Sequence, residues 1–325
     1  MTSAGVGPAP RVMKTLNEVY SSLSTKRRYE VWFLRLGLAD GSGAWWFRYL
    51  LLNPGQAVSG GSLTGMPVQV WATFFDANGQ PRTFIQGFPV ESLDLSGRGE
   101  SPFHFAVPGN AIDDNSCRGR LCVDAHEIVW DLRCRSTFRV TLSDKGWIGF
   151  SRSPHSDAIF SGSIVLDGRV FKGDPLGFGV QGHNCGYRHR TFWRWAHAFF
   201  PRDGNASTLE VLVYDMPLGF NFWKAVLWHD GQESTFYRCR QTACDRENFR
   251  WGFQCETNET SLDAVIDGAS SNIHRLPYLK TDCSGTFDVL NNSLARATIR
   301  IERPRGQVET LETATGAVLE MGGQG

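Results

Sequence analysis

The chain has 325 residues, more than one hydrophobic core usually serves, so we expect two domains. Basic and acidic residues balance at 33 each, so the chain lacks the net positive charge of nucleic-acid binders. No stretch approaches the ~18 consecutive apolar residues of a membrane-spanning helix, and the N-terminus lacks the apolar core of a signal peptide. We therefore expect a cytoplasmic protein with no nucleic-acid partner and no integral membrane segment.

Residues 1–27 predict a polar lead with a short amphipathic helix over 13–23. Two hairpins follow. The runs 29–38 and 44–52 are rich in aromatic and β-branched residues and flank Asp-Gly-Ser-Gly, and a similar pair over 67–85 flanks Asn-Gly. Both turns are typical of β-hairpins.

Short strand-like segments continue to residue 303, separated by Gly, Asp, Ser and Pro. The candidates are residues 103–107, 127–132, 137–142, 146–150, 158–166, 169–171, 209–215, 220–228, 233–239, 249–255, 279–290 and 295–303. Neither βαβ alternation nor long helical periodicity occurs, so the pattern favours antiparallel barrels or sandwiches. The segment 304–325 ends in Gly-Gly-Gln-Gly, and we expect it to be a flexible tail.

The densest group of proton-transferring side chains lies between residues 182 and 215. If residues 191–200 form one strand, Trp193, Trp195 and His197 share a face, because side chains alternate along a strand. These residues could line an aromatic site. An ordinary structural role, with two core tryptophans and a hydrogen-bonded histidine, explains the pattern equally well.

Asp215 ends the alternating run 209–215, on the same side as three apolar residues. Burial of a carboxyl group favours its protonated form, which could donate a proton. Alternatively, Asp215 has already left the strand and begins the next turn.

Eight cysteines would form four disulfides in a secreted protein, but in the cytoplasm we expect free thiols. Neither the histidine spacing nor the Cys-x4-Cys pairs at Cys117 and Cys239 match a zinc motif. The sequence also lacks the motifs of nucleotide binding, nucleophile elbows and metalloproteases. We therefore expect neither a metal nor a cofactor.

Several short motifs together resemble the carotenoid 1,2-hydratase (hydroxyneurosporene synthase) superfamily, which is similar in fold to tocopherol cyclases and fungal Diels-Alderase-type cyclases. The motifs are the hairpin that begins at Tyr29, His183-Asn184-x-Gly186, Trp193-x-Trp195 and Val213-Tyr214-Asp215. The resemblance implies an all-β fold of two calycin- or lipocalin-like antiparallel β-barrels packed side by side, with few short helices. On this basis the barrels span residues 28–181 and 182–303, between the lead 1–27 and the tail 304–325.

The resemblance further implies a cofactor-free, non-redox enzyme of secondary metabolism. Such an enzyme hydrates an alkene, or cyclises or isomerises a lipophilic isoprenoid- or polyketide-type molecule, in an aromatic-lined cavity. The family's hydratase motif is Asp-His-Asn-Trp-Gly, whereas this chain has Gly182-His183-Asn184-Cys185-Gly186. The first and fourth positions therefore differ from the family's pattern.

In this scheme Asp215 donates the proton, His183 relays or orients it, and Tyr214 forms a hydrogen bond. The predicted substrate-binding residues are Asn184, Cys185, Trp193, Trp195 and His197. An alternative with the same fold is a carrier or sensor of a hydrophobic ligand without chemistry, because a shared fold does not determine function.

Overall fold

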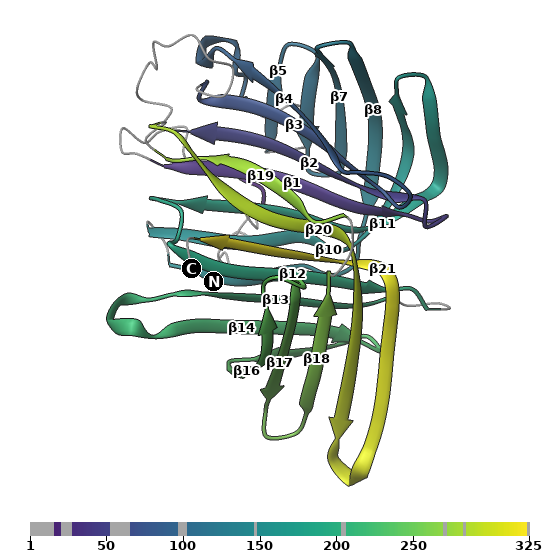
Figure 1. The fold of residues 1–325 in the computed structure, drawn as a ribbon, viewed down its shortest axis with the longest axis vertical. Coiled ribbons are helices and arrows are strands. Elements are labelled where there is room, and N and C mark those ends of the chain that lie inside the picture. Colours follow the sequence, from purple (N-terminus) through teal and green to yellow (C-terminus); the bar gives the residue numbers. More distant parts are fainter. Residues whose placement is uncertain are drawn as a thin grey trace, which may run out of the picture.

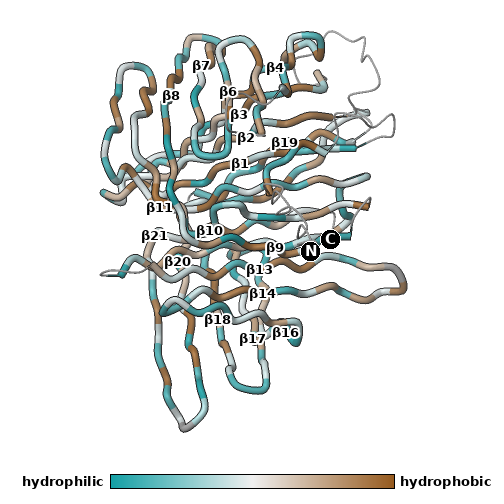
Figure 2. Tube along the Cα trace, turned by 180° about the vertical axis from the view of Figure 1, so that it is seen from behind, coloured by the Kyte–Doolittle hydropathy of each residue, from teal (hydrophilic) through white to brown (hydrophobic). Residues whose placement is uncertain are grey.

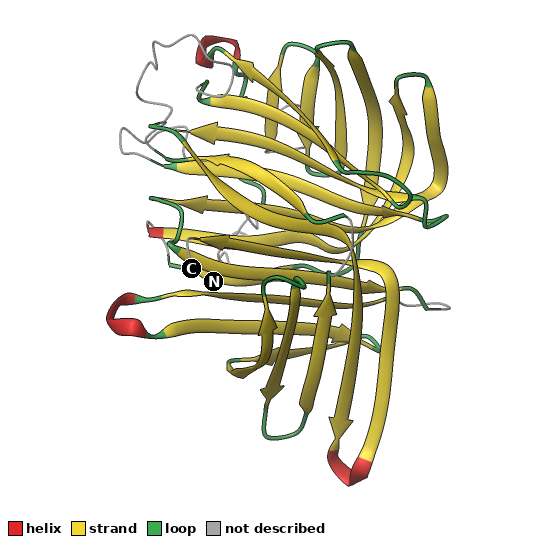
Figure 3. Ribbon diagram, viewed as in Figure 1, coloured by secondary structure: helices red, strands yellow, loops and turns green. Residues whose placement is uncertain are grey.

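The computed structural model consists of two antiparallel β-sheets, which lie one above the other in Figure 1. It describes residues 16–20, 28–52, 66–96, 103–145, 148–202, 206–268, 272–281 and 284–323. Within these residues the helical segments are short 3-10 turns, at Val90–Ser92, Pro217–Gly219 and Pro304–Gly306, together with Ile148 (Figure 3). The predicted all-β fold is confirmed.

The first sheet contains eleven strands within the described part of the chain, in the order β4-β3-β2-β1-β11-β10-β8-β7-β6-β5, with β9 paired to β10. Its strands are β1 (Tyr29–Leu38), β2 (Gly43–Leu52), β3 (Val68–Asp76), β4 (Arg82–Phe88), β5 (His104–Val107), β6 (Asn110–Asp113), β7 (Ser116–Val123), β8 (His126–Arg135), β9 (Val140–Asp144), β10 (Gly149–Leu166) and β11 (Arg169–Gly186).

The second sheet contains ten strands among the residues described, in the order β15-β14-β13-β12-β21-β20-β18-β17-β16, with β19 paired to β20. Its strands are β12 (Phe192–Phe200), β13 (Ser207–Asp215), β14 (Asn221–His229), β15 (Gln232–Phe236), β16 (Arg238–Asp245), β17 (Arg250–Glu256), β18 (Ser261–Asp267), β19 (His274–Leu279), β20 (Thr286–Arg303) and β21 (Gln307–Gly323).

Each sheet curls around its own core because apolar side chains alternate along the strands. In β8 every second residue is buried, and hydrophilic and hydrophobic positions alternate along this strand in Figure 2. The first core includes Trp32, Trp45 and Phe47, and the second includes Trp251 and Phe253. The sheets are therefore two barrels with separate interiors.

A third apolar cluster joins the two barrels. Phe33 and Trp46 contribute from the first barrel, and Trp195, Leu212 and Val226 from the second. β1 and β2 are consequently buried on both faces, which explains why their sequences read as nearly continuous apolar runs.

Arg35 also connects the barrels. Its side chain is fully buried in β1, and its guanidinium donates hydrogen bonds to the backbone carbonyls of Thr315, Gly316 and Ala317 at 2.9–3.0 Å, and to that of Ser293. Burial lowers the pKa of Arg35 to about 9. The charge of Arg35 is therefore bound by carbonyl oxygens of the neighbouring barrel.

Three predictions about the chain's organisation need correction. The expected flexible tail is wrong over Gln307–Gly323, because this segment is β21 and pairs with both β12 and β20. The first sheet continues through Gly186, so the break between sheets lies at residues 187–191 and not at 182. The predicted helix over 13–23 lies mostly outside the described residues, and residues 16–20 form turns and bends.

The expectation of free thiols is wrong for one pair. Cys239 and Cys255 face each other in the β16–β17 ladder, with Cα atoms 4.1 Å apart, and form a disulfide. Among the described residues, the remaining cysteines are free thiols: Cys117, Cys122, Cys134, Cys185 and Cys244.

Candidate active site

A cavity of about 770 Å³ lies between the two barrels. Both barrels line it, together with the segment 187–190 that connects them. The described residues on its lining are Arg28, Tyr29, Val31, Phe33, Trp46, Arg48, Ser143, Lys145, Ile148, Gly149, Phe150, Ser151, Asn184, Cys185, Gly186, Tyr187, Arg188, His189, Arg190, Trp193, Trp195, Leu212, Tyr214, Tyr278 and Glu320. A site between the barrels, and not inside one of them, is therefore the main candidate for ligand binding.

Strand alternation determines which side chains reach this cavity. In β12, Trp193 and Trp195 point toward it, whereas Ala196 and Ala198 pack inside the second barrel. The predicted shared face of Trp193 and Trp195 is confirmed. The same parity in β1 directs Phe33 to the cavity and leaves its neighbours in the first barrel's core.

Aromatic rings form the wall at the junction of the barrels. Phe33 and Trp46 stack with ring centroids 5.5 Å apart, and Trp195 packs edge-on against them at 5.5 and 5.9 Å. Such edge-to-face contacts hold rings in defined orientations. The wall is therefore apolar and rigid.

The space near Phe33 explains one departure from the family's motif. A Cβ atom on Gly182 would lie 2.1 Å from the Phe33 ring, so no larger side chain fits unless that ring moves. Phe33 thus occupies the place of the side chain that the hydratase motif carries at this position.

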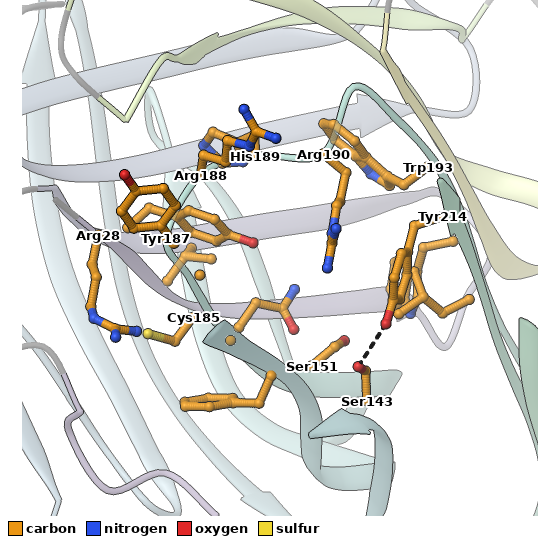
Figure 4. Close-up of a pocket in the computed structure, with 18 of the residues that line it drawn as sticks. Arg28, Ser143, Ser151, Cys185, Tyr187, Arg188, His189, Arg190, Trp193 and Tyr214 are labelled. Carbon is orange, nitrogen blue, oxygen red and sulfur yellow. Dashed lines mark hydrogen bonds between the residues drawn. The ribbon is translucent and has the colours of Figure 1, made fainter. Parts of the chain in front are cut away.

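Hydroxyl and amide groups provide hydrogen bonding on another side of the cavity. The Tyr214 and Ser143 hydroxyl oxygens lie 3.1 Å apart, a contact drawn as a dashed line in Figure 4. The Oδ1 atom of Asn184 is buried and has no hydrogen-bond partner among the described residues. Both groups could bind a polar atom of a ligand.

Glu320 is the one carboxyl group among the described lining residues. It is 7% exposed and accepts hydrogen bonds from the Trp193 indole at 2.9 Å and the Tyr278 hydroxyl at 2.6 Å. Burial raises the pKa of Tyr278 well above its usual value, so this phenol remains a donor near neutral pH. The Asn291 side-chain amide donates a third, longer hydrogen bond to Glu320 at 3.4 Å. The cavity therefore contains a carboxylate held by three donors, which is a suitable group for proton transfer.

A second buried carboxyl group, Glu210, lies behind the aromatic wall. It accepts hydrogen bonds from Ser153 at 2.7 Å, the Trp195 indole at 3.0 Å and Ser156 at 3.3 Å. Burial raises the pKa of Glu210 to about 7, although these donors oppose the effect. Glu210 thus positions Trp195 from outside the cavity.

The two predicted site histidines do not line the cavity. His183 is fully buried in the first barrel, where Nε2 lies 2.8 Å from Glu30 and Nδ1 lies 2.7 Å from the Leu16 carbonyl oxygen. Nε2 of His197 lies 2.7 Å from the Ser156 carbonyl oxygen, and burial lowers the pKa of this histidine to about 3. Both nitrogens of His183 and Nε2 of His197 are therefore engaged in structural contacts.

Asp215 is also absent from the cavity lining. It is the last residue of β13, and its carboxylate accepts hydrogen bonds from the Thr191 hydroxyl and, at 3.1 Å, from the Phe192 backbone amide. It thereby stabilises the start of β12. This position does not support the predicted role of proton donor.

The remaining predicted site residues do line the cavity: Tyr214, Asn184, Cys185, Trp193 and Trp195. Sequence reasoning missed Glu320 and Tyr278, which come from β21 and β19. It also missed Glu210. This residue lies on the same face of β13 as Leu212 and Tyr214, so strand alternation could have predicted its position beside the site.

A different polar cluster lies away from the cavity. His229, Asp230 and Glu309 are the described residues whose ligand atoms are close enough to hold a metal ion. Arg202 lies 3.1 Å from both carboxylates, and Arg303 lies 3.8 Å from Glu309, so two guanidinium groups balance the two carboxylates. The cluster is therefore a salt-bridge network in this structure.

No protein-family model and no curated protein matches the chain. Solved structures do match it. Kievitone hydratase from Nectria haematococca is 10% identical, with a TM-score of 0.56 over 95% of this chain and 92% of its own length. CghA with Sch210972 is 11% identical, with a TM-score of 0.59 over 91% of this chain and 88% of its own.

These similarities concern the fold, and they confirm the predicted likeness to double-barrel hydratases and cyclases at that level. Among the residues that the structure describes, no helix has the length and apolar character needed to cross a membrane.

Proposed function

We propose that this chain is an enzyme of the hydratase or cyclase type that acts on a lipophilic small molecule between its two barrels. The observation that carries the proposal is the aromatic-walled cavity with a carboxylate, Glu320, held by three donors. Its volume of about 770 Å³ suits a drug-sized molecule. The similarity in fold to a hydratase supports the same class.

The charge of the cavity indicates which reaction path it favours. Among the described residues, five arginine and lysine side chains line it, so a free carbocation would be electrostatically opposed. Negative charge that develops on a substrate oxygen would instead be stabilised. We therefore favour addition to, or cyclisation of, an alkene conjugated to a carbonyl group over protonation of an isolated alkene.

In a hydration of this kind, Glu320 takes a proton from water while the water oxygen bonds to the β-carbon of the alkene. The substrate carbonyl becomes an enolate, whose charge lies near basic side chains such as Arg190. The same proton then passes from Glu320 to the α-carbon, and the net change is the addition of one water molecule.

The other residues have supporting roles in this proposal. Tyr278 and Trp193 hold the carboxylate, Tyr214 and Asn184 bind polar atoms of the substrate, and Trp195 excludes bulk water. We assign no proton transfer to His183, because both of its ring nitrogens are occupied within the first barrel.

The experiment is incubation of the purified protein with lipophilic enones and polyenes in heavy-oxygen water, followed by chromatography and mass spectrometry. A hydratase yields the substrate plus one labelled water, and a cyclase yields an isomer of changed retention. Binding of these compounds without conversion of any of them would contradict the proposal and support the carrier alternative.

A further inference from the structure

Basic side chains outnumber acidic ones on the lining of the inter-barrel cavity. Against Glu320, the described basic residues are Arg28, Arg48, Lys145, Arg188 and Arg190. His189 adds no charge near neutral pH, because burial, together with the nearby Arg48, lowers its pKa to about 3. Between apolar walls, this excess produces a positive potential that attracts anions.

Arg48 is one of two of these cations, with Arg28, whose side chains are buried. Its side chain is 4% exposed, and its guanidinium carbon lies 3.7 Å from the centroid of the Tyr278 ring and 4.7 Å from that of Trp71. These rings hold the guanidinium in place through cation–π contacts.

Within the described part of the chain, the guanidinium of Arg48 nevertheless has no anionic partner. Nη1 is buried without a hydrogen-bond partner, and no carboxylate of a described residue forms an ion pair with it. A buried charged group that leaves one of its donors without an acceptor is costly in free energy. A ligand group that accepts hydrogen bonds and carries negative charge would offset that cost.

A second cation lies on the same cavity. Arg190 extends from the segment 187–190 into the space between Tyr187 and Tyr214 in Figure 4, and its guanidinium carbon lies 4.6 Å from the Tyr214 ring centroid. Two arginines that face one cavity, with one carboxylate among its described lining residues, favour a ligand that brings its own negative charge.

We propose that the ligand of this cavity is a lipophilic carboxylic acid, whose carboxylate binds Arg48 while its apolar part lies against Phe33, Trp46 and Trp195. The planar fork of a guanidinium matches a carboxylate with two parallel hydrogen bonds. The inference rests on one part of the proposed function, namely that the inter-barrel cavity binds the ligand. It adds the chemical class of that ligand.

The test is a fluorescence titration with pyrenebutyrate and pyrenebutanol at neutral pH. These probes differ only in a terminal carboxylate or hydroxyl. The wild-type protein should bind the acid at least about tenfold more tightly, in line with a charge-assisted hydrogen bond. Arg48→Met should abolish this preference and leave the affinity for the alcohol unchanged.

Arg169→Met is the matched control. Arg169 also lies over two aromatic rings, at 4.7 Å from Phe171 and 5.6 Å from Phe74, but it does not line the cavity. This variant should keep the preference for the acid.

Equal affinity of the wild-type protein for the two probes would overturn the inference. So would an Arg48→Met variant whose affinities for the acid and for the alcohol fall by the same factor. If Arg48→Met does not fold, Arg48→Lys decides. Arg48→Lys keeps the positive charge but loses the planar guanidinium, so the affinity for the acid should fall severalfold. An unchanged affinity for the acid would refute the role of Arg48.

The two proposals can fail separately. Turnover of neutral compounds without a preference for acids would refute the carboxylate ligand and leave the proposed function intact. A clear preference for the acid without any turnover would refute the proposed enzymatic function and leave the carboxylate ligand intact.

Discussion

Glu210 offers a sharp test of the electrostatics behind the aromatic wall. Burial raises its pKa from 4.5 to about 7, so between these values the folded protein holds a proton that the unfolded chain releases. The associated stability is fully present below about pH 4.5 and is lost as the pH rises through about 7. Since a tenfold change in proton affinity is worth about 1.4 kcal/mol, the effect amounts to about 3 kcal/mol.

Glu210→Gln removes the ionisable group and keeps its shape. Between about pH 4.5 and pH 8 the unfolding free energy of the variant should therefore fall by about 3 kcal/mol less than that of the wild type. Urea denaturation followed by tryptophan fluorescence at several pH values measures this difference. Glu312→Gln, an exposed position on β21, is the control and should follow the wild type. Parallel curves for Glu210→Gln and the wild type would refute the assigned shift.

Three further outcomes are expected. Arg35→Met should lower the unfolding free energy by about 3–5 kcal/mol, because four carbonyl oxygens between the barrels lose their donor. Urea denaturation measures this change, and a loss below about 1 kcal/mol would contradict the expectation. Gly182→Asp, which introduces the first residue of the hydratase motif, should destabilise the fold by about 3 kcal/mol or more, because Phe33 must move. Thermal unfolding measures the change, and a wild-type melting temperature would show that the site has room. Asp215→Asn should leave turnover within about threefold of wild type, since Asp215 does not line the cavity. Loss of product formation without loss of stability would instead support Asp215 as the proton donor.

Local patterns predicted much of the fold. The hairpins β1–β2 and β3–β4 match their predicted segments closely, because turn residues and alternating apolar residues agree there. The long strand β10 was predicted as two segments, 146–150 and 158–166, and β11 only as residues 169–171. Pro154 and Pro175 lie in the stretches that were not predicted, and Gly162 lies inside β10. Register shifts between Arg152 and His155, and between Phe160 and Gly162, accommodate two of these residues without ending the strand.

Strand parity also explains the outcome for the site. Trp193, Trp195 and Tyr214 share the cavity because alternation applies within each strand. His183 and Asn184 are consecutive residues of β11, so their side chains point to opposite sides of the strand. Only one of the two can therefore line the cavity, and it is Asn184. Glu320 escaped prediction because pairing across the sheet, and not its local sequence, makes residues 307–323 a strand.

The most direct test of the central claim is the effect of Glu320→Gln on the turnover and binding of one identified substrate. If Glu320 transfers the proton in the inter-barrel cavity, turnover should fall at least about a hundredfold while the Kd changes by less than about threefold. Glu312→Gln on the same strand should leave both unchanged. Full turnover by the Glu320→Gln variant would contradict the proposed site.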